Sequence, residues 1–347
     1  MGHDLIVIGS SAGGIEALCA LTAELPADLA AAICIVQHVS PTHDSQLPRI
    51  LSAAGPLPAA FADNDTAITP GHIYVARRDR HLIVADGKLK VMMGPKENNF
   101  RPAVDPLFRS AASSYGARVV GVILSGALDC GTAGLLAVKR CGGVALVQDP
   151  DEAIMGDMPR SAIENVPVDA VLPLVALAAR LVELSREPVR ARMHSVPRHI
   201  LEEVKLDGLA PDVDSIAPIG VPAGLTCPNC AGPMYDVPDG AQLRFRCRVG
   251  HAFGGKSLSA EQLNVTEGAF WAALRALEEQ AALARRLATR ARELGQTRSV
   301  RMFEERASSA EHQARIVREE LLKSLTPSDD AETVANGTAA LPVSVKR

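Results

Sequence analysis

The stretch LIVIGSSAGG at residues 5–14 decides the expected fold class. Its first four residues are aliphatic, as in a buried strand, and the small residues after them permit a tight turn into an Ala-rich helical segment. Similar strand and helix patterns alternate up to about residue 184. We therefore expect βαβ units that build a doubly wound, mainly parallel α/β sheet.

The remaining elements of this region are predicted by the same criteria. Strands are expected at 5–9, 32–37, 72–76, 81–84, 119–125 and 144–148, and helices at 14–24, 105–115 and 132–141. Asp105 followed by Pro106 is typical of a helix N-cap followed by proline at the first helical position.

Composition excludes several classes of protein. The net charge of −4 does not favour binding to nucleic acid. No apolar run is long enough to insert into a membrane or to act as a signal peptide. Seven cysteines without a secretory leader argue against a disulfide framework and predict a cytoplasmic protein with reduced thiols.

The chain is too long for one average domain, and its composition changes after residue 185. We expect an α/β domain at 1–185, a Pro-rich linker at 186–224, a small hairpin unit at 225–256, a helical hairpin at 257–325 and a disordered tail at 326–347. Two apolar seams with spacings of three and four residues predict the helical hairpin. Each seam covers only about three heptads, so packing within the chain is favoured over a partner-binding coiled coil.

Candidate catalytic residues follow three of the predicted strands. Ser11 is the centre of a G-x-S-x-G sequence at a strand-to-helix turn, where the nucleophile of a serine hydrolase can sit. A phosphate-binding loop is the alternative, but the glycine spacing fits neither nucleotide-binding motif. His38 follows the strand at 32–37 and is the candidate general base, while Asp129 and Cys130 follow the strand at 119–125. The order Ser, His, acid differs from that of the α/β-hydrolases.

At these positions the sequence resembles the catalytic domain of the bacterial chemotaxis protein-glutamate methylesterase (CheB) family, over residues 3–184. The motifs that carry the resemblance are IGSSAGG (8–14), VQH (36–38), GHIYVA (71–76), RPAVDPLF (101–108), LSG (124–126) with GTAG (131–134), and QDP (148–150) with MPRSA (158–162). The resemblance implies that Ser11 is the nucleophile and His38 the base.

The sequence departs from the family pattern at the third catalytic position. The family has an aspartate immediately before the glycine equivalent to Gly131, and this chain has Cys130 there. Asp129 is the candidate substitute, although neighbouring side chains in an extended segment point apart. Ala12 replaces a threonine found in many chemotaxis members, and its backbone N–H remains the candidate oxyanion donor.

A second constellation predicts a metal site outside the catalytic domain. Cys227 and Cys230 form a C-x-x-C pair, and Cys247 and His251 follow across a predicted hairpin. Three thiolates and one imidazole suit a structural, tetrahedral zinc ion in a zinc-ribbon-like unit, and the alternative is a set of buried thiols without metal. No cofactor is expected for catalysis.

The resemblance implies a serine carboxylic-ester hydrolase that converts γ-glutamyl methyl esters on chemoreceptor helices to glutamate and methanol, with glutamine deamidation as a second activity. Chemotaxis members of the family commonly carry an N-terminal phosphoacceptor receiver domain, whereas this sequence starts at the catalytic strand, so we expect a stand-alone form. In that form the C-terminal units would bind partners or regulate activity, and other chemosensory signalling proteins are further candidate partners. Two alternatives stay open. One is a catalytically weakened binding or regulatory module, because Cys130 replaces the family aspartate, and the other is a serine esterase for small molecules.

Overall fold

The computed structural model describes residues 2–39, 45–189, 196–208, 220–238, 240 and 242–325. The expected tail at 326–347 lies outside the described residues. The chain divides into two compact units, one up to Ser259 and the other from Ala260 onward, and each is described by itself.

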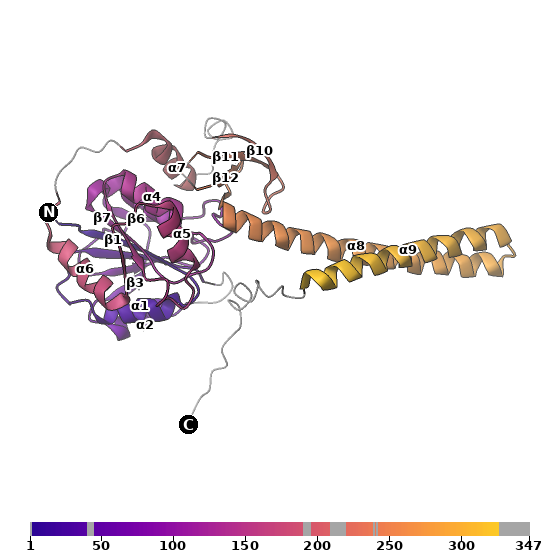
Figure 1. Ribbon diagram of the computed structural model, residues 1–347, viewed down its shortest axis with the longest axis horizontal. Helices are drawn as coiled ribbons and strands as arrows, with labels where there is room; N and C mark the ends of the chain where they lie inside the picture. Colours follow the sequence, from indigo (N-terminus) through magenta and orange to yellow (C-terminus); the bar gives the residue numbers. More distant parts are fainter. Residues whose placement is uncertain are drawn as a thin grey trace, which may run out of the picture. The chain divides into compact units, whose positions relative to one another are not determined.

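The first unit is built on a parallel sheet (Figure 1). Its seven strands lie in the order β3-β4-β2-β1-β7-β8-β9. The strands are β1 (Leu5–Ser10), β2 (Ala32–Gln37), β3 (Ala59–Phe61), β4 (Ile73–Val75), β7 (Val119–Ile123), β8 (Val144–Gln148) and β9 (Ala170–Leu172). The central strands are buried along their whole length, because helices cover both faces and leave no side of the strand in water. The predicted parallel α/β fold is confirmed.

Helices pack on both faces of this sheet and form two apolar cores. One core contains side chains of α1 (Gly14–Ala23), α2 (Leu47–Ala54) and α6 (Leu174–Arg186). The other contains side chains of α3 (Val104–Tyr115), α4 (Thr132–Arg140) and α5 (Asp157–Asn165). A short 3-10 turn, Gly116–Arg118, leads from α3 into β7.

Two local predictions in this region differ from the structure. The strand expected at 81–84 forms, but β5 (His81–Ala85) pairs with β6 (Lys88–Met92) in a separate antiparallel hairpin. Asp105 is not the N-cap of its own helix, which begins one residue earlier. Its carboxylate instead accepts the N–H groups of Gly131 at 2.9 Å and Gly134 at 2.6 Å, and so caps α4 from a distance in the sequence.

The segment expected to be linker contains α7 (Arg198–Gly208). The local sequence pattern does not indicate this helix, because α7 is stabilised by tertiary contacts. Its buried side chains Glu203 and Asp207 pair with Arg109 of α3. An antiparallel sheet follows, with β10 (Val221–Thr226), β11 (Pro233–Asp236), β12 (Arg244–Cys247) and β13 (Ala252–Gly254). We call residues 220–254 the ribbon.

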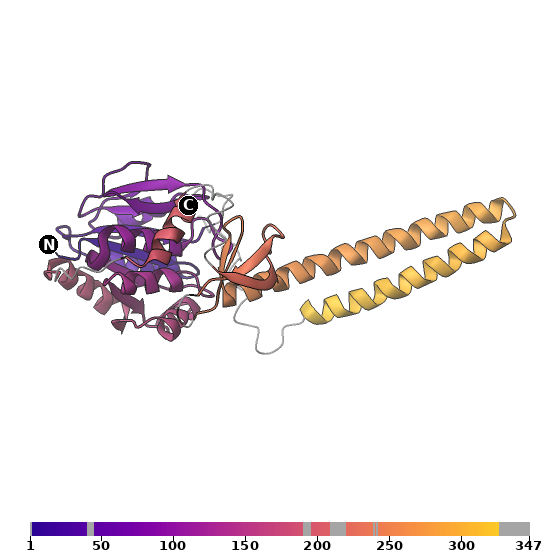
Figure 2. The same ribbon diagram turned by 90° about the horizontal axis from the view of Figure 1, so that it is seen from above.

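The second unit is a helical hairpin, and the first turn of its first helix still belongs to the first unit. α8 (Gly255–Glu293) and α9 (Thr297–Leu325) run antiparallel on either side of a turn in which Gly295 has φ +70° (Figure 2). Small side chains fill the seam, which allows the two backbones to approach closely; its buried residues are Leu274, Ala281, Ala284, Ala288, Ala291, Ala307, Ala310, Ala314 and Leu321. The predicted helical hairpin is confirmed. None of the described helices is long and apolar enough to cross a membrane.

Candidate active site and metal centre

Ser11 and His38 meet at the carboxyl edge of the sheet because their strands are direct neighbours. β1 and β2 pair in parallel with Ser10 opposite Gln37, so the next residue of each strand also lies side by side. The His38 N–H donates to the Ser10 carbonyl at 3.0 Å and extends the ladder to this point. β1 lies between β2 and β7, where the strand order reverses, and open α/β sheets bind ligands at such positions.

The Ser11 hydroxyl and the His38 imidazole are within hydrogen-bond distance. The Ser11 Oγ lies 3.2 Å from His38 Nδ1, so the hydroxyl can donate to this nitrogen when the ring proton is on Nε2. The turn that presents Ser11 depends on Gly13, whose φ is +72°. A Cβ atom at Gly13 would lie 2.5 Å from the Ile154 Cβ, so both backbone conformation and space require glycine.

Buried polar side chains hold the two loops together. Gln37 donates from Nε2 to the carbonyls of Ser11 (2.7 Å) and His38 (3.0 Å) and accepts the Ser10 hydroxyl at 2.6 Å. On the other side, the Ser125 carbonyl accepts the Ser11 N–H at 2.9 Å. These bonds fix the backbone on both sides of the nucleophile, which reduces the reorganisation needed during reaction.

The peptide segment at Ala12 is held through its carbonyl group, while its N–H group, the candidate oxyanion donor, is unbonded within the described residues. The Ser125 hydroxyl donates to the Ala12 carbonyl at 2.7 Å, which fixes the orientation of this peptide segment. Within the described parts of the chain the Ala12 N–H has no hydrogen-bond acceptor. A free N–H beside the nucleophile at the start of a helix can stabilise negative charge on a substrate oxygen.

One aromatic side chain stacks on the His38 ring. Phe100 stacks on it with ring centroids 3.7 Å apart and planes 8° from parallel. Burial lowers the pKa of His38 to about 3, so the imidazole is neutral at physiological pH and is a weaker base than a solvated histidine. Its Nε2 is buried and has no hydrogen-bond partner among the described residues.

Asp129 has partners other than His38 in this structure. Its carboxylate accepts the N–H groups of Lys256 at 3.1 Å and Ser257 at 3.2 Å, together with the Ser257 hydroxyl. Asp129 therefore caps the first turn of α8. The structure thus brings together Ser11 and His38, while a catalytic role for Asp129 stays a prediction.

Cys130 is buried beside Asp105. Its Sγ lies 3.6 Å from Asp105 Oδ2, and burial together with this carboxyl group raises the pKa of the thiol well above its ordinary value. Cys130 is therefore a neutral thiol, which cannot stabilise an imidazolium as a carboxylate does. Burial, and next the charge of Glu97, raise the pKa of Asp105 to about 6.

Comparison with known proteins identifies the family of the sheet domain. A family model described as CheB methylesterase matches residues 6–181, which is half of the chain. The chain belongs to the CheB methylesterase family. A putative protein-glutamate methylesterase/protein-glutamine glutaminase of Leptospira interrogans is 38% identical over 187 residues, which are 54% of this chain and 97% of that relative.

A longer relative and a solved structure agree with this assignment to CheB. A protein-glutamate methylesterase/protein-glutamine glutaminase of Anaeromyxobacter dehalogenans is 40% identical over 51% of this chain and 52% of its own length. The crystal structure of the Thermotoga maritima CheB methylesterase catalytic domain is 34% identical, with a TM-score of 0.50 over 52% of this chain and 98% of that one. The family model ends before α7, the ribbon and the helical hairpin.

The four predicted metal ligands of this CheB-family chain lie together in the ribbon. The ligand atoms of Cys227, Cys230, Cys247 and His251 are all within 4.8 Å of one another, so the cluster could hold a metal ion. The Cys230 and Cys247 sulfurs are 3.7 Å apart. A tetrahedral site with Zn–S bonds of about 2.3 Å requires sulfurs about 3.8 Å apart, so the spacing fits zinc.

A buried ionic cluster joins α3, α7 and the ribbon. It contains three guanidinium groups and three carboxylates, each side chain at most 5% exposed: Glu97, Arg109, Glu203, Asp207, Arg244 and Arg246. Burial acts to raise the pKa of Glu97, but Arg109 and the neighbouring arginines outweigh it and lower this pKa to about 2. The cluster is charge-balanced, as buried ions must be.

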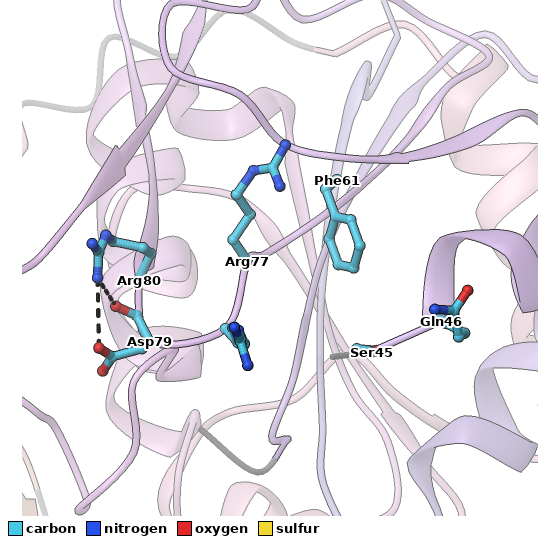
Figure 3. Close-up of a pocket in the computed structure, with 7 residues that line it drawn as sticks. Ser45, Gln46, Phe61, Arg77, Asp79 and Arg80 are labelled. Carbon is cyan, nitrogen blue, oxygen red and sulfur yellow. Dashed lines mark hydrogen bonds and ion pairs between the residues drawn. The ribbon is translucent and has the colours of Figure 1, made fainter. Parts of the chain in front are cut away.

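A basic cavity opens at the same carboxyl edge of the CheB sheet. It has a volume of about 730 Å³ and follows β3 and β4, of which β4 is the neighbour of β2; its lining residues are Ser45, Gln46, Phe61, Arg77, Arg78, Asp79 and Arg80 (Figure 3). The Arg77 guanidinium lies 5.4 Å from the centre of the Phe61 ring and pairs with Asp63 at 2.6 Å. Arginines outnumber acidic groups in the lining, so the cavity favours anionic ligands.

Sequence reasoning missed three contributors to the site. Gln37 was within a family motif, but nothing in the sequence gave it a role. Phe100 and Glu97 belong to no motif of fixed spacing, and each contacts a residue far away in the sequence: Phe100 stacks on His38, and Glu97 binds Arg244. The only available indication was the unusual pair Asn98-Asn99, which is typical of a tight turn.

Proposed function

We propose that this chain is a protein-glutamate methylesterase whose reaction centre is Ser11 with His38. The observation that carries the proposal is the 3.2 Å contact between Ser11 Oγ and His38 Nδ1 at the carboxyl edge of a CheB-family sheet. A nucleophile and a neutral base in contact are the minimum for acyl transfer by serine.

The reaction follows from the positions of the groups. Ser11 Oγ attacks the carbonyl carbon of a γ-glutamyl methyl ester while His38 Nδ1 takes the hydroxyl proton. The Ala12 N–H stabilises the oxyanion. The intermediate collapses as His38 returns the proton to the departing methanol, and water repeats the sequence on the acyl-enzyme to release glutamate. Glutamine deamidation would use the same steps with ammonia as leaving group, in line with the names of both relatives.

The basic cavity supports an acidic protein segment as substrate. Glutamates of a methylated chemoreceptor helix that are not being hydrolysed could lie against Arg77 and Arg80, which follow the strand next to β2, in exchange for the present partners Asp63 and Asp79. A reduced, cytoplasmic setting suits this substrate and the free thiols of the chain.

The missing carboxylate supports a second candidate, a catalytically weakened module that binds receptor or signalling helices. Asp129 caps α8, and Cys130 is a neutral thiol. Loss of the carboxylate from a serine triad lowers turnover by about 10⁴, so slow hydrolysis is expected even if Ser11 is competent.

Methanol release from a methylated chemoreceptor tests these alternatives, with wild type, Ser11→Ala and the exposed control Ser52→Ala. Esterase function predicts release by wild type and Ser52→Ala but not by Ser11→Ala. Binding of the receptor without methanol release by any of the three would support the binding module. Faster hydrolysis of a chromogenic small ester than of the receptor would instead favour a small-molecule esterase.

We also propose that the ribbon binds zinc through Cys227, Cys230, Cys247 and His251. Support comes from the donor set and the sulfur spacing. All four tetrahedral positions are protein ligands, so zinc would be structural here and would supply folding energy to the ribbon. Metal analysis of the purified chain should give one zinc per chain, and Cys230→Ser should reduce this value.

A further inference from the structure

The orientation of His38 has an unusual origin. In a serine triad a carboxylate holds the imidazole, whereas here the Nε2 of His38 has no partner among the described residues. Among the described residues, the His38 ring has a hydrogen-bond contact with Ser11 and a parallel stack with Phe100, and the stack sets the plane of the ring. Whatever fixes Phe100 therefore also fixes the candidate base.

Phe100 is the last residue of a tight turn. The backbones of Glu97 and Phe100 exchange hydrogen bonds of 3.2 Å and 3.0 Å, and the two residues between them, Asn98 and Asn99, have φ values of +52° and +66°. Positive φ at both central positions defines a narrow type I′ turn, which asparagine tolerates.

The ribbon fastens this turn through β13. The Asn98 N–H donates to the Ala252 carbonyl at 2.7 Å, and the Asn98 Oδ1 accepts the Gly254 N–H at 2.7 Å. The Asn98 Nδ2 donates to Asp105 at 3.1 Å, on the side of the CheB domain. Asn98 is thus bonded to both parts of the unit at once.

The metal ligands are directly connected to β13. Cys247 ends β12, and its N–H donates to the carbonyl of His251 at 2.8 Å. His251 immediately precedes Ala252, the residue that receives the Asn98 N–H. A loop closed by four ligands is ordered by the metal, so loss of metal would loosen β13 and the turn that it holds.

We propose that the ribbon is a positioning device for the reaction centre, in which the Cys3His site, β13 and Asn98 hold Phe100 against His38. Phe100 and Asn98 are then positioning residues, because they act through His38 and not on the substrate. The inference rests on the proposed function, and it assigns the extra C-terminal region a task within the esterase centre. It also makes that centre dependent on metal or on the reduced state of the thiols.

Two readouts on the full chain test this proposal. The first is the NMR resonances of the His38 ring, assigned with His38→Gln, because the ring current of Phe100 shifts nuclei stacked beneath it. The second is kcat and KM for ester hydrolysis. The protein is compared with zinc bound, after chelation and after zinc is restored.

The variants separate positioning from general loss of structure. Cys230→Ser weakens the ligand set, and Cys19→Ser is the matched control because this partly exposed thiol lies on α1 outside the cluster. Asn98→Gly keeps the positive φ while removing the two side-chain bonds, and it serves if Cys230→Ser fails to fold. Phe100→Leu removes the stack itself.

We expect chelation, Cys230→Ser, Asn98→Gly and Phe100→Leu each to move the His38 resonances toward one common position, and Cys19→Ser to leave them in place. Aromatic pairs contribute about 0.5–1.5 kcal/mol, so kcat should fall about 2- to 12-fold with KM nearly constant. Cys230→Ser combined with Phe100→Leu should be no slower than Phe100→Leu alone, because both remove one interaction.

Unmoved His38 resonances in folded Cys230→Ser or Asn98→Gly would overturn the positioning role, as would rate effects that multiply in the double variant. If wild type hydrolyses no ester, the esterase function fails. The NMR comparison would still decide the positioning role, so the two failures are distinguishable.

Discussion

Replacement of Arg244 by methionine tests whether the buried ionic cluster holds the ribbon and α7 on the CheB domain. Arg244 binds Glu203 through two parallel bonds of 2.9 Å and 2.8 Å, and its side chain is 4% exposed. Methionine nearly fills the same volume, so the substitution removes charge with little change in packing. Three carboxylates then face two guanidinium groups.

The expected loss of stability in Arg244→Met depends on the arginines that still contact Glu203. Loss of one partner from a buried ion pair destabilises proteins by about 3–5 kcal/mol, since the other charge is left without compensation. Arg109 and Arg246 still lie 3.4 Å and 3.3 Å from Glu203, so we expect about 3 kcal/mol. The double variant Arg244→Met/Glu203→Gln restores charge balance and should lose only about 1 kcal/mol.

Pulse labelling of buried thiols during a urea titration measures the free energy of unfolding of the sheet and of the ribbon separately. Cys34 lies in β2 and reports on the sheet, while Cys247 reports on the ribbon. Labelling of both should shift to lower urea in Arg244→Met and return in the double variant. A shift below about 1 kcal/mol, or no recovery on neutralising Glu203, would refute the argument that the cluster is bound by its charge balance.

The same cluster predicts an acid limit to stability. The folded-state pKa of Glu97, about 2, is below its ordinary value of 4.5. Its stabilising contribution is therefore complete above pH 4.5 and is lost as the pH falls toward 2. Arg244→Met removes one of the charges that lower this pKa, so its stability should fall less steeply across that interval than that of wild type.

Three further predictions concern the site. Because the pKa of His38 is lowered to about 3, kcat/KM for ester hydrolysis should stay level from pH 8 to 5, whereas a base titrating near 6.5 would give about a tenfold loss per pH unit below that value. Asp129→Ala should destabilise the start of α8 by about 1–2 kcal/mol, which would be measured as faster amide hydrogen exchange at 256–259. The kcat for ester hydrolysis should stay within about twofold of the wild-type value. A fall in kcat approaching 10⁴ would instead make Asp129 the acid of a catalytic triad. Arg77→Glu should raise KM for a methylated acidic helix without changing hydrolysis of a neutral small ester, and equal effects on both would contradict the docking role of the cavity.

The sequence alone predicted the parallel sheet, the neighbouring positions of Ser11 and His38, the cluster of three cysteines and one histidine that could hold a metal ion, and the helical hairpin. Each of these depends on local signals: apolar periodicity, glycine at a turn, residues that directly follow neighbouring strands, or fixed ligand spacing. Such features can be predicted without knowing which distant residues are in contact, because the backbone geometry of strands and helices already sets the direction of their side chains.

Tertiary structure decided what surrounds that framework. The sequence could not reveal that Asp105 caps α4, that Asp129 caps α8, or that Phe100 stacks on His38. Nor could it find α7 within a Pro-rich segment, because Glu203 is buried against Arg244, 41 residues later in the chain. A carboxylate can satisfy any nearby N–H group or guanidinium, and which one it meets depends on how whole segments pack. Local patterns carry no information about that choice.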